Sequence, residues 1–208
     1  MQLRRDDVLR GALELLDVEG LDGLTMRKLG DHLGVRHSGL HWHFKTKRDL
    51  LDAMAEALVN GVGDELPDAA WDVQITTLAH RLRAALIARR DGARTVAGTY
   101  VADQATIEIG RVGMEALCRA GFESREAVVA LTVIGHYVLG HTIEEQAWSA
   151  LTAAERENKL DKAISVNGEI GRVVHDAFLG DPVDRFGYGL SALVEGLRSK
   201  LEQTKRRA

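Results

Sequence analysis

Apolar residues recur at spacings of three and four along most of the chain, which is typical of helices with one buried face. The first such segment starts near Arg5, with Asp6 and Asp7 in its first turn, and Gly20 is expected to end it. Polar residues 149–160 are expected to form a loop. The pattern predicts an all-α fold of nine or ten helices. Those beyond the first are expected over residues 26–33, 38–44, 47–62, 71–90, 93–98, 102–119, 125–148, 162–179 and 183–203.

The second and third predicted helices are short, and turn residues separate the first three helices. Thr25 is a good N-cap for the second helix, and Gly34 with Val35 makes a tight connection to the third. Two short helices joined by a glycine-containing turn are typical of a helix-turn-helix module. We therefore predict a three-helix module over residues 1–46 and a larger helical bundle over residues 47–208, with helix 47–62 as the connector.

Composition agrees with a soluble helical protein. The chain of 208 residues is 45% hydrophobic and 28% charged, and its two prolines leave long stretches without helix breakers. The single cysteine, Cys118, excludes a disulfide within the chain and a cysteine-based zinc site. No run of about eighteen apolar residues is present, so no membrane-spanning helix is expected. Because the start of the chain also lacks a secretory signal pattern, we expect a cytoplasmic protein.

Positive charge is concentrated near the predicted turn. The net charge is −4, yet the segment from Arg36 to Arg48 holds four Lys or Arg residues, three histidines and no acidic residue. A local basic stripe on an otherwise acidic chain is the electrostatic pattern of a small DNA-reading surface.

Specific motifs carry a family resemblance. The stretches Gly20-Leu21-Asp22-Gly23-Leu24-Thr25-Met26-Arg27-Lys28-Leu29 and Leu40-His41-Trp42-His43-Phe44-Lys45-Thr46-Lys47 resemble the TetR family of transcriptional regulators. Further along, Arg90-Asp91-Gly92-Ala93, Gly121-Phe122 and His136-Tyr137-x-Leu139-Gly140 resemble its tetracycline repressor subgroup. The resemblance implies a homodimer that binds palindromic double-stranded operator DNA and responds to a small-molecule effector. No cofactor, metal or membrane partner is expected.

The resemblance also implies which residues bind DNA. A recognition helix places its early residues at the base edges of the major groove. The sequence departs from the family at His41, where tyrosine is usual, and at Gly39, where a threonine-like residue is common. Leu40, Trp42 and Phe44 are expected in the core of the module rather than on DNA. The candidate base readers are Arg36, His37, Ser38, Gly39 and His41, and the candidate phosphate contacts are Thr25, Arg27, His43 and Lys47.

A second set of residues matches positions around the family's effector cavity. His136 and Glu144 lie close to one helical face, whereas His141 is turned about 140° from His136, so those two histidines are not expected to share a metal. Val96 aligns with the histidine that binds drug-bound magnesium in the tetracycline repressor, which argues against a magnesium–tetracycline effector. A more apolar organic effector is expected. The candidate effector-binding residues are Leu78, Leu82, Val96, Thr99, Tyr100, His136, Tyr137 and Glu144.

Two other functional classes fit the sequence less well than a regulator does. A helical enzyme has little support, since Cys118 has no histidine at a recognisable spacing and the chain lacks a glycine-rich phosphate loop and an H-E-x-x-H motif. A protein-interaction adaptor without DNA binding would leave the basic stripe unexplained. The sequence favours a non-enzymatic transcriptional repressor, and it leaves the effector, the operator and the direction of regulation open.

Overall fold

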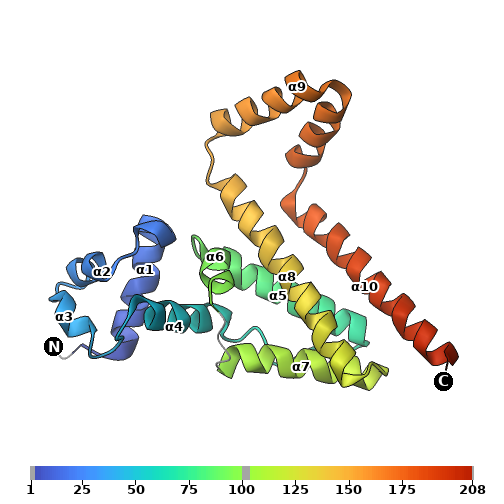
Figure 1. Ribbon diagram of the computed structural model, residues 1–208, viewed down its shortest axis with the longest axis horizontal. Helices are drawn as coiled ribbons and strands as arrows, with labels where there is room; N and C mark the ends of the chain where they lie inside the picture. Colours follow the sequence, from blue (N-terminus) through green and yellow to red (C-terminus); the bar gives the residue numbers. More distant parts are fainter. Residues whose placement is uncertain (1–2, 100–103, 208) are drawn as a thin grey trace. The chain divides into compact units, whose positions relative to one another are not determined.

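The computed structural model describes residues 3–99 and 104–207, and these ranges contain ten α-helices and no strand (Figure 1). The predicted all-α fold of nine or ten helices is confirmed. The helices are α1 Arg5–Gly23, α2 Met26–His32, α3 His37–Leu40, α4 Lys47–Val59, α5 Trp71–Ile87, α6 Gly92–Ala97, α7 Gln104–Ala120, α8 Ser124–Ser149, α9 Ala153–Leu179 and α10 Pro182–Arg207.

The chain forms two compact units. The first, Met1–Thr142, holds α1 to α7 and most of α8, and the second, Ile143–Ala208, holds the end of α8 with α9 and α10. The predicted boundary after residue 46 falls inside the first unit, where Leu50 and Met54 of α4 are buried with residues of α1 to α3. The division into a DNA-binding part up to residue 46 and a ligand-binding part after it therefore stays a prediction.

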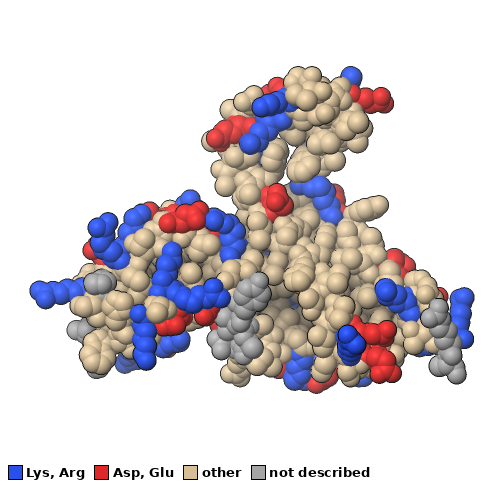
Figure 2. All heavy atoms as spheres, viewed as in Figure 1, with Lys and Arg blue, Asp and Glu red and all other residues tan. Residues whose placement is uncertain are grey.

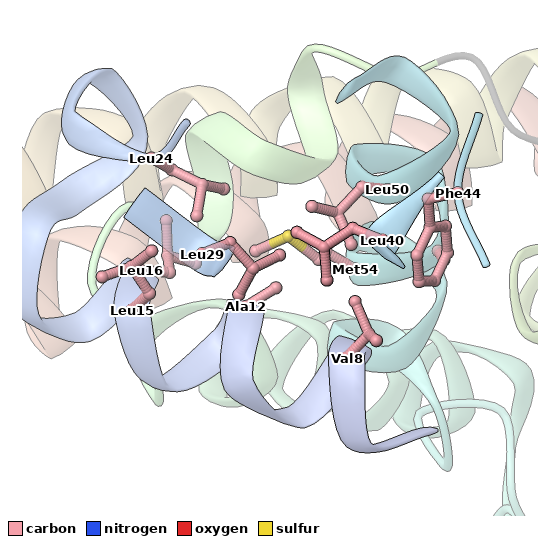
Figure 3. Close-up of a cluster of buried hydrophobic side chains, with 11 residues drawn as sticks. Val8, Ala12, Leu15, Leu16, Leu24, Leu29, Leu40, Phe44, Leu50 and Met54 are labelled. Carbon is pink, nitrogen blue, oxygen red and sulfur yellow. The ribbon is translucent and has the colours of Figure 1, made fainter. Parts of the chain in front are cut away.

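The small N-terminal module is built around an apolar cluster (Figure 3). Leu40 and Phe44 are buried there as expected, but Trp42 is 91% exposed, so its predicted place in the core is wrong. The Phe44 N–H donates to Leu40 O at 2.9 Å, which places these two side chains one turn apart and turns Trp42 outward. The cluster comprises Val8, Ala12, Leu15, Leu16, Leu24, Leu29, Leu40, Phe44, Leu50, Ala53 and Met54.

Helix α9 starts earlier than the sequence pattern predicts. The loop expected over residues 149–160 is wrong, because α9 begins at Ala153. Thr152 caps it: the Glu155 N–H donates to Thr152 Oγ1 at 3.2 Å, and the Thr152 N–H donates to Glu155 Oε2 at 2.8 Å. These two reciprocal hydrogen bonds satisfy backbone N–H groups at the start of α9 that would otherwise bond to water.

Helix α8 is the most apolar of the long helices. Among the described residues it is the one helix with the length and mean hydropathy, 1.3 over its most apolar 18 residues, that a membrane-spanning helix also has. Core helices of soluble proteins meet the same criterion. Only 28% of that stretch is buried in the single chain, and Val128, Val129 and Val133 are exposed on it.

Candidate nucleic-acid interface and ligand cavity

The cap of α2 and the turn that follows it define the connection between α2 and α3. Thr25 Oγ1 accepts from the Lys28 N–H at 3.2 Å and so caps α2. Gly34 ends this helix with a φ of +66°, a conformation that side chains rarely adopt, and the Val35 N–H donates to Gly30 O at 2.9 Å. Arg36 then stands at the N-cap position of α3.

Three of the candidate DNA-binding residues share one surface of this module. Arg27, Arg36 and Ser38 are exposed and line an open depression between α2 and α3 that also includes Asp31. Lys and Arg side chains project from this part of the molecule in Figure 2. Of the other candidates, Thr25 and His41 are exposed, whereas Gly39, His43 and Lys47 are half-buried; the side chain of His37 lies outside the described structure.

Two of these residues have defined local positions. Lys47 lies in the first turn of α4, directly after Thr46, which forms a capping box with Asp49. The backbone N–H groups and dipole of a helix N-terminus favour an anion such as phosphate. His41 Nδ1 lies 3.0 Å from Lys45 O, which orients the ring against the turn that leads into α4.

Gly39 has free space on the side where other residues carry a side chain. A Cβ placed on it would meet no atom within 4 Å, so packing inside the chain does not require glycine there. A glycine in the reading helix leaves room for another molecule to approach the backbone closely.

Charged residues join the N-terminal module to α6. The Leu21 N–H donates to Asp91 Oδ2 at 2.9 Å, and Arg94 pairs with both Asp22 and Asp91. Hydrogen bonding and attraction by Arg94 lower the pKa of Asp22, and the two carboxylates raise the pKa of Arg94. The end of α1 is thereby tied to the start of α6.

A cavity of about 220 Å³, partly open to solvent, lies among α5, α7 and α8 within the first unit. Its walls are almost entirely apolar, and its polar side chains are the hydroxyl groups of Thr106 and Thr132. The larger apolar residues that line it are Ile75, Leu78, Leu82, Ile109, Leu131, Ile134 and Val138.

The structure brings together only part of the predicted effector set. Leu78 and Leu82 line the cavity. Val96 and Thr99 are half-buried near the end of α6, where Thr99 Oγ1 donates to Val96 O at 2.8 Å, and neither lines the cavity. Tyr100 lies outside the described residues.

The three α8 candidates also lie away from the cavity lining in the single chain. His136 and Glu144 are exposed, and the half-buried ring of Tyr137 lies 5.9 Å from that of His141. The cavity instead uses Leu131, Thr132, Ile134, Gly135 and Val138 of the same helix. Sequence reasoning missed Thr106 and Thr132, because a single threonine in an apolar pattern gives no signal of which space it faces.

No cluster suited to a metal is found in the described ranges 3–99 and 104–207, where groups of three or more His, Cys, Asp or Glu side chains do not come together. The arrangement offers hydrogen bonds, charge and apolar surface, and its two parts suit two different ligands. The basic end suits a polyanion, and the cavity suits a small apolar molecule.

Comparisons with known proteins agree with this arrangement. Residues 8–54 match the family model described as "Bacterial regulatory proteins, tetR family", and residues 64–201 match "Tetracyclin repressor-like, C-terminal domain". The chain is 39% identical over 203 residues to the class A tetracycline repressor protein of Escherichia coli, covering 96% of this chain and 92% of that protein.

Solved structures show the same fold. A possible TetR family regulator from Streptomyces coelicolor A3(2) has a TM-score of 0.87 and 35% identity, over 94% of this chain and 99% of that one. BioQ of Mycobacterium smegmatis, in a structure with its double-stranded DNA operator, has a TM-score of 0.72 and 28% identity, over 95% of this chain and 99% of that one. The chain belongs to the TetR family, and it is a ligand-responsive DNA-binding transcriptional regulator with a tetracycline-repressor-like C-terminal domain.

Proposed function

We propose that this regulator is a homodimeric repressor that leaves a palindromic operator when a small apolar molecule enters the cavity among α5, α7 and α8. The observation that carries the proposal is the presence, in one compact unit, of a basic helix-turn-helix end and an apolar cavity. The proposal assigns the protein no catalysis and places it in the cytoplasm.

DNA recognition is assigned to α3 and the turns around it. Arg36, His37, Ser38, Gly39 and His41 would reach base edges, while Thr25, Arg27, His43 and Lys47 would hold phosphates. A single module of this size offers few phosphate contacts, so tight and specific binding requires two modules on successive turns of the duplex.

The dimer interface is assigned to α8 and α10, which would form a four-helix bundle with those of a second copy. Val128, Val129 and Val133 leave an apolar surface on α8, and Tyr188 on α10 is 80% exposed. Exposed apolar patches of this kind favour burial against a partner. Sedimentation is expected to give a dimer at micromolar concentration, and a monomer there would contradict the assignment.

Effector release requires a link from the cavity to the DNA-binding end, and α4 is the candidate. It begins at Lys47, and its Glu56 accepts a hydrogen bond from the Ala105 N–H at the start of α7, a helix that lines the cavity. An effector shifts the repressor only if it binds one placement of α4 more tightly than the other.

Footprinting on the DNA that flanks the protein's own gene tests the proposal directly. Protection of a palindromic site, lost on addition of one compound from a library of neutral organic molecules, is the expected result. No protected site at low salt, where phosphate contacts are strongest, would contradict a role as a repressor of that region.

A further inference from the structure

The two threonine residues that line the cavity are exposed in the single chain, and each hydroxyl group has a hydrogen-bond acceptor on the protein. Thr132 Oγ1 donates to Val128 O at 2.9 Å, and Thr106 Oγ1 lies 3.5 Å from Glu56 Oε2, a long contact for an O–H···O hydrogen bond. A hydroxyl group has one proton and two lone pairs. Because each proton has an acceptor on the protein, both oxygens are available to a ligand as hydrogen-bond acceptors.

Glu56 supplies the acceptor that faces the Thr106 hydroxyl group. Its Oε1 accepts from the Ala105 N–H while its Oε2 accepts from Thr106, so the carboxylate bridges two successive residues at the start of α7. An ionised carboxylate accepts hydrogen bonds and donates none. Its negative charge also disfavours an anionic ligand group at the same end of the cavity.

The remaining surface of the cavity offers nothing to compensate a ligand charge. No Lys, Arg, His, Asp or Glu is found among the lining residues in the described part of the chain. Burying an ionised group without a partner costs far more than burying a neutral one. A cavity of about 150 Å³ holds a benzene molecule, so roughly 220 Å³ suits a compound of one or two rings.

We infer that the effector is an apolar, non-anionic molecule of one or two rings that carries an O–H or N–H donor, and that Thr106 and Thr132 accept its hydrogen bond. The inference rests on the proposed function only in treating this cavity as the effector site. Thr106 and Thr132 would thus set specificity, and Glu56 would be a positioning residue that acts through Thr106.

Three naphthalene probes test this chemistry on the full chain. 1-Naphthol is neutral and has a donor, 1-methoxynaphthalene keeps the oxygen but has no donor, and 1-naphthoate is an anion. Fluorescence titration is expected to show 1-naphthol binding about three- to tenfold more tightly than 1-methoxynaphthalene, the effect of one net hydrogen bond. This preference would oppose the extra methyl group, which by itself favours 1-methoxynaphthalene. Binding of 1-naphthoate is expected to be the weakest.

Threonine-to-valine variants identify the acceptors. The double variant Thr106→Val, Thr132→Val is expected to lose the preference for 1-naphthol while still binding 1-methoxynaphthalene, which also shows that its cavity remains folded. Thr77→Val is the matched control, since Thr77 Oγ1 donates to Val73 O at 2.8 Å in the same way but Thr77 does not line the cavity. Glu56→Gln is expected to weaken discrimination against 1-naphthoate.

Several outcomes would overturn the inference. They are equal or tighter binding of 1-methoxynaphthalene, tightest binding of 1-naphthoate, a preference that survives in the double variant, or no binding of either neutral probe. A gel-shift assay on the flanking DNA is read separately. If the protein does not bind the flanking DNA but still prefers 1-naphthol, the result would contradict the repressor proposal but not the inferred ligand chemistry.

Discussion

Arg94 holds Asp22 in a bidentate ion pair across the join between the DNA-binding module and the core. Arg94 Nη1 lies 3.1 Å from Asp22 Oδ2, and Arg94 Nη2 lies 3.1 Å from Asp22 Oδ1. Fork-shaped pairing of this kind fixes orientation as well as distance. The pair therefore restricts how the end of α1 can turn relative to α6.

The stability that Asp22 contributes should depend on pH. Its pKa is lowered in the folded protein because Arg94 hydrogen-bonds and attracts the carboxylate. A group whose folded pKa is lowered adds stability above its unfolded pKa and loses it as pH falls through the folded pKa. Asp22→Asn should therefore be less stable than the parent chain at pH 7, and the difference should disappear in acid. Urea unfolding at a series of pH values measures this difference.

A charge-matched variant completes that experiment. Asp68→Asn removes a negative charge from an exposed position in the segment before α5. It controls for the change in net charge. A stability difference for Asp22→Asn that stays constant from neutral to acidic pH would show that the ion pair with Arg94 does not act as inferred.

Gly20 is required where α1 turns, and its replacement should be costly. Its φ of +72° favours glycine, and a Cβ there would lie 2.9 Å from Asp91 Oδ2 and 3.1 Å from Arg90 Nε. Gly20→Ala should destabilise the protein by about 1–2 kcal/mol from the backbone alone, with a further loss from the displaced Asp91. Thermal unfolding monitored by circular dichroism measures the loss.

Gly34→Ala separates the two contributions. Gly34 also has a positive φ, +66°, but a Cβ there would meet no atom within 4 Å. Only the backbone cost should therefore apply to Gly34→Ala. Equal losses for the two variants would mean that the contact of residue 20 with Asp91 adds nothing.

The fold could be predicted closely because its signals are local. Thr25 and Gly34 mark the ends of α2 through capping and a positive φ, and both act within a few residues. The start of α9 had an equally local signal, the spacing of Thr152 and Glu155, but the polar composition of residues 149–160 concealed it. A helix can thus be predicted from the sequence where its capping residues are weighted more heavily than the polar composition of the segment.

The cavity could not be predicted in the same way, because it depends on which faces of distant helices meet. The eight-residue spacing of His136 and Glu144 does place them close to one face of α8. The cavity, however, is lined by Leu131, Thr132 and Val138 of that helix. Periodicity identifies a helical face but not the neighbour that the face meets.

Truncation of Trp42 and of Leu40 should change the stability of the protein by very different amounts, although the two residues are only two positions apart. Trp42 is 91% exposed and Leu40 is fully buried. Trp42→Ala should change stability by less than about 0.5 kcal/mol, whereas Leu40→Ala should cost about 2–5 kcal/mol through the cavity it leaves. Chemical denaturation of both variants measures this contrast, and comparable losses would place Trp42 in a packed environment after all.

Lys47 and His37 should affect DNA binding in different ways. Lys47→Ala should weaken binding to operator and to unrelated DNA alike, and it should make the salt dependence shallower by about one unit of slope, as expected for one phosphate contact. His37→Ala should change which sequence is preferred. Lys162→Ala, outside the DNA-binding module, is the control for loss of a positive charge. An equal loss on all sequences for both Lys47→Ala and His37→Ala would reject this division of roles.

This regulator should not have magnesium–tetracycline as its effector, although the chain is 39% identical to a class A tetracycline repressor. Val96 stands where the resemblance aligns a magnesium-binding histidine, and a valine side chain has no lone pair to give a metal. The cavity offers two hydroxyl groups among apolar walls, so a charged metal complex would lose its hydration without adequate replacement. Calorimetry with tetracycline and excess magnesium should show no magnesium-dependent binding, with the class A protein titrated in parallel to check the assay. Sub-micromolar, magnesium-dependent binding would overturn this prediction.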